Sequence, residues 1–408
     1  MRILHTSDWH LGKNLEGCSR LEEQELFIEE LIEIVDRENV DMIIISGDIY
    51  DTGNPPARAE KLFYFALKKI SKGGKRPVLV IAGNHDHPER LSAAGPLAYE
   101  QGIILLGTPK SIARVGEYPY YKITDAGEGY VEIEKDKEKV VIITIPYPSE
   151  KRLNELISIS MDEEEMQRSY SERMAVLFDN LSSKYRKDTI NIAAGHFFIS
   201  GGESTDSERP IQLGGSLAID PSVLPRKAQY VALGHLHRPQ KVKGTEVEAR
   251  YSGSPLQYSK SEISYSKSLY IVDVCVGEKA NIQEVYLKNY KPIEVWRCES
   301  IEEAIKKCEE NSKRNVWVYL EIKTDRILLQ SEIKEMKKTK EDIVEILPLF
   351  YESEKEEKEL KSIKEKKVDE LFKEFYIHQK QVQPSAEMME LFLSIINEEE
   401  EKDEAQDA

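Results

Sequence analysis

The sequence predicts an α/β protein that carries two further parts, a small α+β domain and a C-terminal helical tail. Over about the first 275 residues, short apolar runs alternate with helical patterns, which is typical of a sheet built from crossover units. A smaller alternation of strands and helices follows between residues 291 and 350. Two amphipathic stripes then lie near the end of the chain.

Several predicted strands of the first part are continuously apolar, as strands buried on both faces should be. Between them, residues 20–37 and 57–70 carry apolar side chains at helical spacing and are predicted helices. The strands are expected at residues 2–4, 41–46, 77–82, 140–145, 189–194 and 229–233, and a further apolar run covers 268–275.

The second part reads as a strand–helix–strand–helix–strand unit that is compact enough to be a separate domain. We therefore assign residues 1–280 to the larger domain and residues 285–350 to the smaller one. The strands of the smaller domain are expected at 293–298, 316–323 and 342–350, and its helices at 300–312 and 328–339.

The remaining residues divide by charge and periodicity. Residues 351–367 are a charge run, which indicates a solvated linker. Residues 368–400 regain amphipathic helical character, and residues 401–408 form an acidic tail. The base expectation for such helices is packing on their own protein. The apolar stripes include Leu371, Phe372, Phe375, Leu391, Phe392 and Ile395.

Composition and charge exclude some classes of protein. No run approaches the roughly 18 apolar residues of a membrane helix, and the N-terminus lacks a signal peptide, so we expect a cytoplasmic protein without a membrane span. The four cysteines form no C-x-x-C pair, which favours reduced, structural thiols.

The net charge is −17, but residues 351–408 hold 18 acidic and 9 basic side chains, so the remaining 350 residues carry only −8. A polyanionic substrate is therefore not excluded.

Five short polar segments stand at or just beyond the ends of predicted strands. Because ligands of an α/β sheet bind outside the carboxyl ends of its strands, we expect these segments to converge. The glycines that precede four of their polar residues should let the backbone turn tightly. The segments are residues 8–10, 47–51, 83–86, 195–196 and 234–237.

Two of these segments contain paired ligands at a spacing of two. Extended backbone would place Asp8 and His10 on one face, and likewise His235 and His237, so that each pair can reach one centre.

The polar segments together offer a mixed set of nitrogen and oxygen ligands. Seven ligands are too many for one tetrahedral ion and suit two ions that share a bridging carboxylate. Imidazole-rich sites favour Mn²⁺, Fe²⁺ or Zn²⁺. The seven candidates are Asp8, His10, Asp48, Asn84, His196, His235 and His237.

The order D-x-H, G-D-x-x-D, G-N-H-D, G-H and G-H-x-H resembles the calcineurin-like metallophosphoesterase superfamily. Within it, residues 1–13, 47–56, 232–240 and 251–259 are similar to the SbcD family, the nuclease subunits of bacterial SbcCD complexes. The resemblance implies a metallophosphoesterase sandwich with a small capping domain.

The resemblance also implies how the ligands are divided. Asp8, His10, Asp48 and His237 would hold one metal, and Asp48, Asn84, His196 and His235 the other, with Asp48 bridging. The implied cofactor is two Mn²⁺ per subunit, for which Mg²⁺, Fe²⁺ or Zn²⁺ could substitute. The implied activities are 3′-to-5′ exonuclease on duplex ends and endonuclease on single strands or hairpins, in DNA repair and recombination.

The catalytic residues implied by the resemblance are His85, as general acid, and Asp51, whose carboxylate would lie beside the imidazole and fix its orientation. Asp86 should secure the turn by accepting hydrogen bonds from nearby backbone amides. His87, before Pro88, is expected to be a loop residue at a helix start.

The metal motifs do not identify the substrate, so the residues around them have to be considered. Lys13, Asn14 and Arg20 follow the first metal motif and Arg238 follows the last, so these side chains could contact DNA phosphates. The smaller domain resembles the capping domain that SbcD-type nucleases use to orient DNA. For any one of these charges, an ordinary solvated side chain is the alternative interpretation.

By resemblance, residues 368–400 would bind the coiled coil of the SbcC ATPase. Helix-in-groove binding requires this amphipathic pattern. No G-x-x-x-x-G-K-[ST] motif occurs in this chain, so ATP dependence would come from that partner. The helices after Asp51 and after His87 could form a homodimer within a heterotetramer.

Two other functions stay open. The superfamily also contains phosphatases and cyclic-nucleotide phosphodiesterases. A non-catalytic DNA-end tether on the same fold is a rival of a different class.

Overall fold

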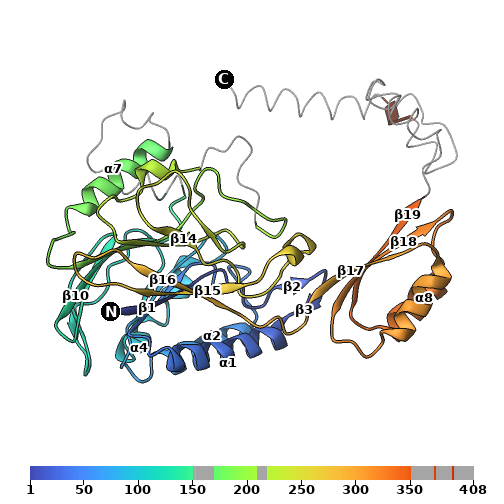
Figure 1. The fold of residues 1–408 in the computed structure, drawn as a ribbon, viewed down its shortest axis with the longest axis horizontal. Coiled ribbons are helices and arrows are strands. Elements are labelled where there is room, and N and C mark those ends of the chain that lie inside the picture. The colour runs from blue at the N-terminus through green and yellow to red at the C-terminus, as the bar shows by residue number, and fades with distance from the viewer. Residues whose placement is uncertain (150–151, 153–169, 209–217, 351–371, 374–387, 390–408) are drawn as a thin grey trace.

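The computed structural model describes residues 1–149, 152, 170–208, 218–350, 372–373 and 388–389. A larger domain contains two β-sheets packed face to face, and a smaller domain, called the cap below, lies beside it (Figure 1). The predicted linker and acidic tail lie outside the described residues, as does most of the predicted helical tail. Of the six predicted partner-binding residues, only Phe372 is described.

The first sheet of the larger domain has six strands in the order β16-β15-β1-β4-β5-β6. Strands β1, β4, β5 and β6 are parallel to one another, whereas β15 pairs antiparallel with β1 and with β16. The parallel strands β4 and β5 are buried along their whole length because both faces of the sheet are covered. The strands are β1 (Arg2–Thr6), β4 (Met42–Ser46), β5 (Val78–Ile81), β6 (Ile103–Leu106), β15 (Ser268–Asp273) and β16 (Asn281–Tyr286).

Two long helices cover the outer face of this sheet, α1 (Leu21–Arg37) and α2 (Ala57–Ile70), which lie side by side in Figure 1. Each buries an apolar stripe at helical spacing, so the two predicted helices are confirmed. The short helices α3 (Pro88–Ser92) and α4 (Gly95–Glu100) follow β5.

The second sheet has eight strands in the order β13-β14-β12-β11-β10-β9-β8-β7. Strands β10, β11, β12 and β14 are parallel. Helix α7 (Tyr170–Ser182) packs on its outer face. The strands are β7 (Gly116–Glu117), β8 (Lys122–Gly127), β9 (Tyr130–Lys135), β10 (Glu138–Ile145), β11 (Ile190–His196), β12 (Tyr230–Gly234), β13 (Gln240–Lys241) and β14 (Ala249–Tyr251).

The core between the sheets consists of the inner faces of both. Ile3 and Ile44 of the first sheet pack in one cluster with Ile142 and Ile192 of the second. The sandwich is therefore the observed form of the predicted α/β domain. The predicted strands are divided between its two sheets, and the antiparallel strands β7, β8 and β9 were not predicted. Strand β8 has one buried residue in six, so it lacks the apolar run of the central strands.

The cap is a parallel three-stranded sheet in the order β17-β18-β19, with two helices on one face. The predicted unit is confirmed element by element. Its elements are β17 (Ile293–Cys298), α8 (Ile301–Glu310), β18 (Trp317–Thr324), α9 (Gln330–Thr339) and β19 (Ile343–Phe350).

The opposite face of the cap sheet contacts the larger domain. Trp317 and Tyr319 pack there with Leu15 of a hairpin formed by β2 (Asn14–Leu15) and β3 (Cys18–Ser19). Turns of 3₁₀-helix lie at Pro221–Val223 (η1) and Lys260–Ser264 (η2). The cap thus has a core of its own and contacts the larger domain at the β2–β3 hairpin.

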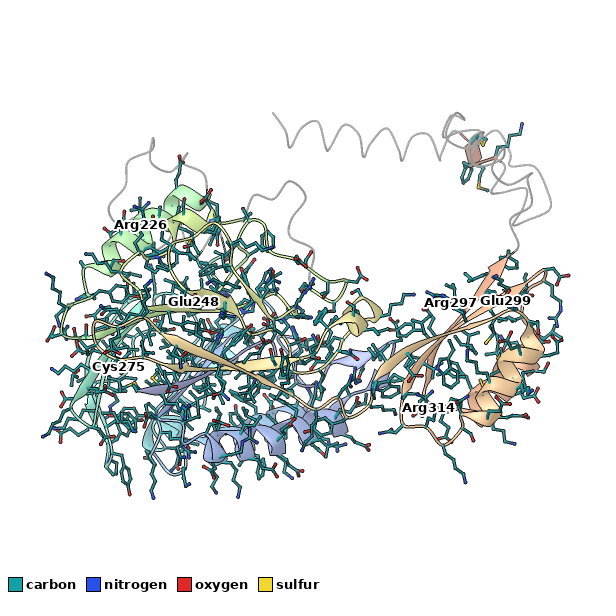
Figure 2. All side chains as sticks on the ribbon, viewed as in Figure 1. Arg226, Glu248, Cys275, Arg297, Glu299 and Arg314 are labelled. Atoms are coloured by element: carbon teal, nitrogen blue, oxygen red, sulfur yellow. The ribbon has the colours of Figure 1, made fainter. Side chains whose placement is uncertain are left out.

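All four cysteines are free thiols, as predicted. Cys298 and Cys308 are buried in the cap, whereas Cys275 is exposed on the larger domain (Figure 2). Among the described residues, no helix combines the length and apolar character that crossing a membrane requires.

Candidate metal centre

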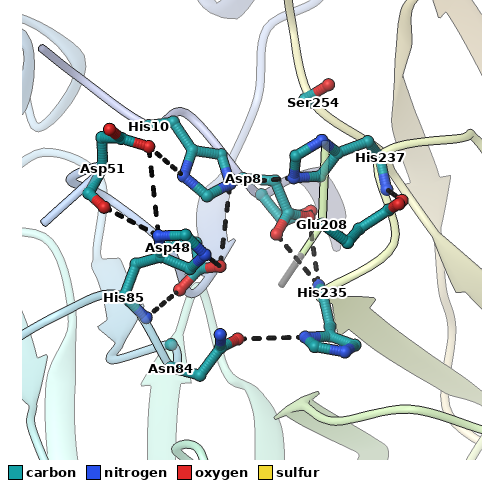
Figure 3. Close-up of polar contacts among 12 residues, drawn as sticks. Asp8, His10, Asp48, Asp51, Asn84, His85, Glu208, His235, His237 and Ser254 are labelled. Carbon is teal, nitrogen blue, oxygen red and sulfur yellow. Dashed lines mark hydrogen bonds and ion pairs between the residues drawn. The ribbon is translucent and has the colours of Figure 1, made fainter. Parts of the chain in front are cut away.

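The polar segments that follow β1, β4, β5 and β12 converge (Figure 3), and the end of β11 joins them through His196. They meet because the parallel strands of both sheets present their carboxyl ends there. All seven predicted ligands lie in this cluster, and six have fully or almost fully buried side chains.

The backbone of the first two segments is not extended, which corrects the expectation for Asp8 and His10. Asp8, His10 and Asp48 have φ angles of 52°, 45° and 51°, in the left-handed region. The Asp8 amide donates to the Gly47 carbonyl and the His10 amide to the Asp48 carbonyl, each at 3.0 Å. Left-handed turns therefore bring the two loops together, where an extended chain would carry them apart.

The glycines of the motifs serve mainly to allow close approach. Only Gly47 among the four has a positive φ, of +90°. A Cβ on Gly83 would lie 2.1 Å from Asp48 Oδ1, and one on Gly234 would lie 1.9 Å from the Ser46 carbonyl oxygen. The positive φ agrees with the predicted tight turn at Gly47, whereas Gly83 and Gly234 leave room for the neighbouring ligand loops.

Asp48 lies at the middle of the cluster. Its Oδ1 accepts a hydrogen bond from the His85 amide at 2.8 Å. Its Oδ2 lies 3.4 Å from His196 Nε2 and 3.7 Å from His10 Nε2. Burial opposes the charge, but the surrounding imidazoles keep the pKa of Asp48 well below its ordinary value. A carboxylate in this place can bridge two cations.

The ring nitrogens of the cluster lie close to one another and to the Asn84 side chain. His196 Nδ1 donates to the Ser46 carbonyl at 2.8 Å, so the neutral ring has no proton on Nε2. That nitrogen lies 2.9 Å from Asn84 Oδ1. His10 Nε2 and His237 Nε2 are also 2.9 Å apart.

This crowding of lone pairs fits bound cations. Within the part of the chain that the structure describes, His10 Nδ1 is buried without a hydrogen-bond partner. Nitrogen and oxygen side chains that converge in a buried cluster are the environment that a divalent metal requires, and the mixed donor set suits Mn²⁺, Fe²⁺ or Zn²⁺.

The pKa values of the clustered side chains are also consistent with a bound cation. Burial alone would lower the pKa of His196, but the Asp48 carboxylate raises it to about 9. In contrast, burial lowers the pKa of His235 to about 3 and raises that of Asp8 to about 7. A bound cation would take the place of the protons that these buried groups compete for.

Among the described residues, three carboxylate–imidazole groups have the spacing of a metal site: Asp8 with His10 and His237, Asp8 with Asp48 and His196, and Asp51 with His10 and His85. His235 Nδ1 is 3.0 Å from Asn84 Oδ1, so His235 and His237 approach different groups. The His235 φ of 108° corrects the extended backbone that was expected for this pair. The division of ligands implied by the resemblance stays a prediction.

His85 stands at the edge of the cluster with its ring held by Asp51, but not through the carboxylate. His85 Nδ1 is 2.7 Å from the Asp51 carbonyl oxygen, whereas Asp51 Oδ1 is 4.0 Å away and accepts from Lys13 Nζ at 2.8 Å. The other ring nitrogen, Nε2, lies 4.0 Å from Asp48 Oδ2. The backbone carbonyl thus orients the imidazole toward the centre, which corrects the expected role of the Asp51 side chain.

The predicted supporting roles of the next two residues are confirmed. Asp86 accepts hydrogen bonds from the amides of Gly83, Ile49 and Tyr50 at 2.9 to 3.1 Å, and so joins its own turn to the Asp48 loop. His87 is the N-cap of α3, where its side chain accepts from the Arg90 amide.

A buried polar group behind His237 was missed by the sequence analysis. His237 Nδ1 lies 3.6 Å from Glu262 Oε1 and contacts Ser207 Oγ. The His237 amide donates to Glu208 at 2.7 Å, and Lys267 pairs with Glu262. Such outer partners fix the tautomer of a metal-binding histidine. They come from polar stretches without periodicity or motif, so nothing in the sequence indicated them.

The four predicted DNA-binding residues occupy different environments. Lys13 lies at the centre beside Asp51, Asn14 is exposed on β2, and Arg238 is partly exposed beside Glu203. Arg20 is only 1% exposed and binds both Glu23 carboxylate oxygens at 2.9 Å. The expectation that Arg20 contacts DNA is therefore wrong, because its guanidinium is enclosed between the two domains.

Family models match both parts of the chain. The calcineurin-like phosphoesterase family matches residues 1–239, and the type 5 capsule protein repressor C-terminal domain matches residues 289–380. A solved dimetal phosphatase from Danio rerio aligns over 70% of this chain and 95% of its own, with a TM-score of 0.39 and 11% identity.

Three bacterial relatives, each named as the SbcD subunit of the nuclease SbcCD, align over most of their length. That of Bacillus subtilis is 44% identical over 405 residues, 99% of this chain and 100% of the relative. That of Staphylococcus epidermidis is 31% identical, over 72% of each chain. That of Rhodobacter capsulatus is 32% identical, over 68% of this chain and 67% of the relative. The chain therefore belongs to the calcineurin-like phosphoesterase family and, within it, to the SbcD nuclease subunits.

Proposed function

We propose that this metal-dependent phosphodiesterase is the Mn²⁺-dependent DNA nuclease subunit of an SbcCD complex, acting as a 3′-to-5′ exonuclease on duplex ends and an endonuclease on single strands and hairpins. The observation that carries the proposal is the cluster of seven nitrogen and oxygen side chains, six of them buried, in a chain that aligns over 99% of its length with an SbcD subunit. The role is DNA repair and recombination.

The chemistry follows from the residues of the centre. Two divalent cations, when bound, lower the pKa of a water and offset charge on the phosphate. Asp8, His10, Asp48 and His237 would hold one, and Asp48, Asn84, His196 and His235 the other. Since His85 Nδ1 donates to the Asp51 carbonyl, its Nε2 faces the centre and carries a proton only in the imidazolium form, and we assign that form of His85 the protonation of the departing sugar oxygen.

DNA would enter between the centre and the cap. Lys13 already directs its ammonium into the centre, and Asn14 and Arg238 lie on exposed parts of the neighbouring loops. We assign these three side chains to phosphate contacts. Arg20 is left out of this set.

The partners follow from exposed apolar surface and from the relatives. Tyr64 and Phe65 of α2 and Leu97 of α4 are 40%, 44% and 74% exposed, so this side of the larger domain offers an apolar surface for a homodimer. Residues 368–400 would bind the SbcC ATPase and complete a heterotetramer. The site of action would be the cytoplasm, where bacterial DNA lies.

One assay in Mn²⁺ tests the proposal. The chain is incubated with an end-labelled hairpin duplex, a labelled blunt duplex and a chromogenic phosphomonoester, and the rates are compared. Cleavage of both DNA substrates, with the hairpin opened internally, is expected. Hydrolysis of the phosphomonoester alone would indicate a phosphatase, and DNA binding without cleavage would indicate a tether.

A further inference from the structure

The first turn of α1 touches both the cap and the metal loops. On the side of the cap, the Trp317 indole N–H donates to Glu23 Oε1 at 3.0 Å. On the side of the metal centre, Gln24 donates to the His10 carbonyl at 2.8 Å and accepts from the Gly12 amide at 2.9 Å. Neighbouring residues of one helical turn therefore connect a cap side chain with the loop that carries a predicted ligand.

Arg20 strengthens this connection. Its guanidinium donates to both Glu23 oxygens and to the Gln257 carbonyl. It lies over the rings of Trp317 and Tyr258, 5.9 Å from each centroid. The charge is thus enclosed by one carboxylate and by aromatic rings from both domains.

Tyr258 completes the path to the metal centre. Its hydroxyl donates to the Trp9 carbonyl at 2.6 Å and accepts from Gln24 at 3.1 Å. Its ring packs edge-on against the rings of His10 and His237, with centroids 5.7 and 6.0 Å apart. Tyr258 therefore supports two predicted ligands from behind.

The whole path is buried: Arg20, Glu23, Gln24 and Tyr258 are 1%, 5%, 0% and 4% exposed. Buried charges leave few alternative arrangements, because each unpaired group would be costly. Close-packed side chains also transmit displacements rather than absorb them. A shift of Trp317 is thus expected to move the His10 loop.

We propose that Trp317 of the cap is a positioning residue for the metal centre, acting through Glu23, Arg20 and the first turn of α1 on the loop that carries His10. The inference rests on the proposed cleavage of phosphodiesters at this centre. It assigns the cap a part in turnover in addition to any contact with DNA.

The test compares two Trp→Phe variants of the full chain. Trp317→Phe keeps a ring but loses the hydrogen bond to Glu23. Trp296→Phe is the matched control, because its indole N–H also donates to a glutamate, Glu294 at 2.8 Å, but within the cap. Both are assayed in Mn²⁺ with bis(p-nitrophenyl) phosphate, a diester too small to reach the cap, and Mn²⁺ affinity is measured by calorimetry.

We expect Trp317→Phe to lower kcat on the small diester about fivefold, with KM nearly unchanged, and to weaken Mn²⁺ binding, whereas Trp296→Phe leaves both unchanged. Glu23→Gln should have the same effect as Trp317→Phe, and the double variant should be no worse than the more affected single one. Thermal unfolding checks that each variant is folded.

Unchanged small-diester turnover and Mn²⁺ affinity in Trp317→Phe, or equal losses in both Trp→Phe variants, would overturn the inference. Failure of the proposed function gives a different result: the wild-type chain would hydrolyse the small diester but leave DNA intact. The calorimetric comparison still decides the role of Trp317 in that case.

Discussion

At the scale of single residues, the centre depends on histidines whose hydrogen bonds to surrounding groups fix their orientation. The Ser46 carbonyl holds His196, the Asp51 carbonyl holds His85, and Glu208 holds the His237 backbone. The two carbonyl contacts engage Nδ1 and leave Nε2 of each ring facing the centre. The ligands were predictable because their types and spacing form motifs, whereas the supporting carbonyls have no sequence signature.

His85→Ala should separate catalysis from metal binding. We expect the variant to retain two metals per chain and to lose about 10²- to 10⁴-fold in DNA cleavage, because the leaving oxygen is no longer protonated. Asp48→Ala should lose metal as well, since its carboxylate lies at the middle of the cluster. Metal content by mass spectrometry and cleavage rates check this.

His87→Ala is the control for the neighbouring imidazole, because His87 only caps α3. Its cleavage rate should stay near that of the wild type. Full activity in purified His85→Ala would remove His85 from the mechanism.

At the scale of elements, the two sheets are tied together at the ends of strands as well as through their core. Asp41, before β4, accepts from the Arg2 amide of β1 at 2.9 Å and contacts Lys135 at the end of β9. Burial raises the pKa of Asp41, but the bonds from Lys135 and Arg2 outweigh it and leave the pKa below its ordinary value. Neither sheet pairing nor this contact could be read from the sequence, because the partners are 94 residues apart.

The contribution of Asp41 to stability should depend on pH. A carboxylate with a lowered pKa stabilises the fold above its unfolded pKa, and this contribution is lost as pH falls through the folded value. Asp41→Asn should therefore reduce the free energy of unfolding by about 0.5 kcal/mol at pH 7, and by less near pH 3, because the pair is partly exposed to solvent. Denaturant unfolding at the two pH values measures this.

Asp136→Asn is the matched control, since Asp136 lies 3.4 Å from the same Lys135 but is 81% exposed. It should change the free energy of unfolding little at either pH. Equal losses in both variants, or a loss in Asp41→Asn that grows at low pH, would contradict the assignment.

At the scale of the whole molecule, the centre joins both sheets, and the first turn of α1 joins the centre to the cap. Bound metal should therefore stabilise the folded chain, because the ligands come from segments that separate on unfolding. Saturation at 100 times the dissociation constant contributes about 2.7 kcal/mol.

Chelation should consequently lower the unfolding temperature of the wild-type chain by several degrees, and restored Mn²⁺ should reverse the change. Calorimetry with and without a chelator measures it. Asp48→Ala provides the reference, because a chelator should hardly shift a chain that no longer binds metal. An unfolding temperature of the wild-type chain that a chelator does not change would argue against a resident metal centre.

The sequence by itself determined which residues enter the centre, because strand ends followed by Asp, Asn and His are local patterns. It also determined the long helices and the cap, whose apolar periodicity is complete within each element. Only the tertiary structure decided how the strands divide between two sheets, which carbonyls and carboxylates hold the imidazoles, and that Arg20 is a buried link instead of a DNA contact. These features depend on contacts between distant segments, and a single side chain carries no record of its partner.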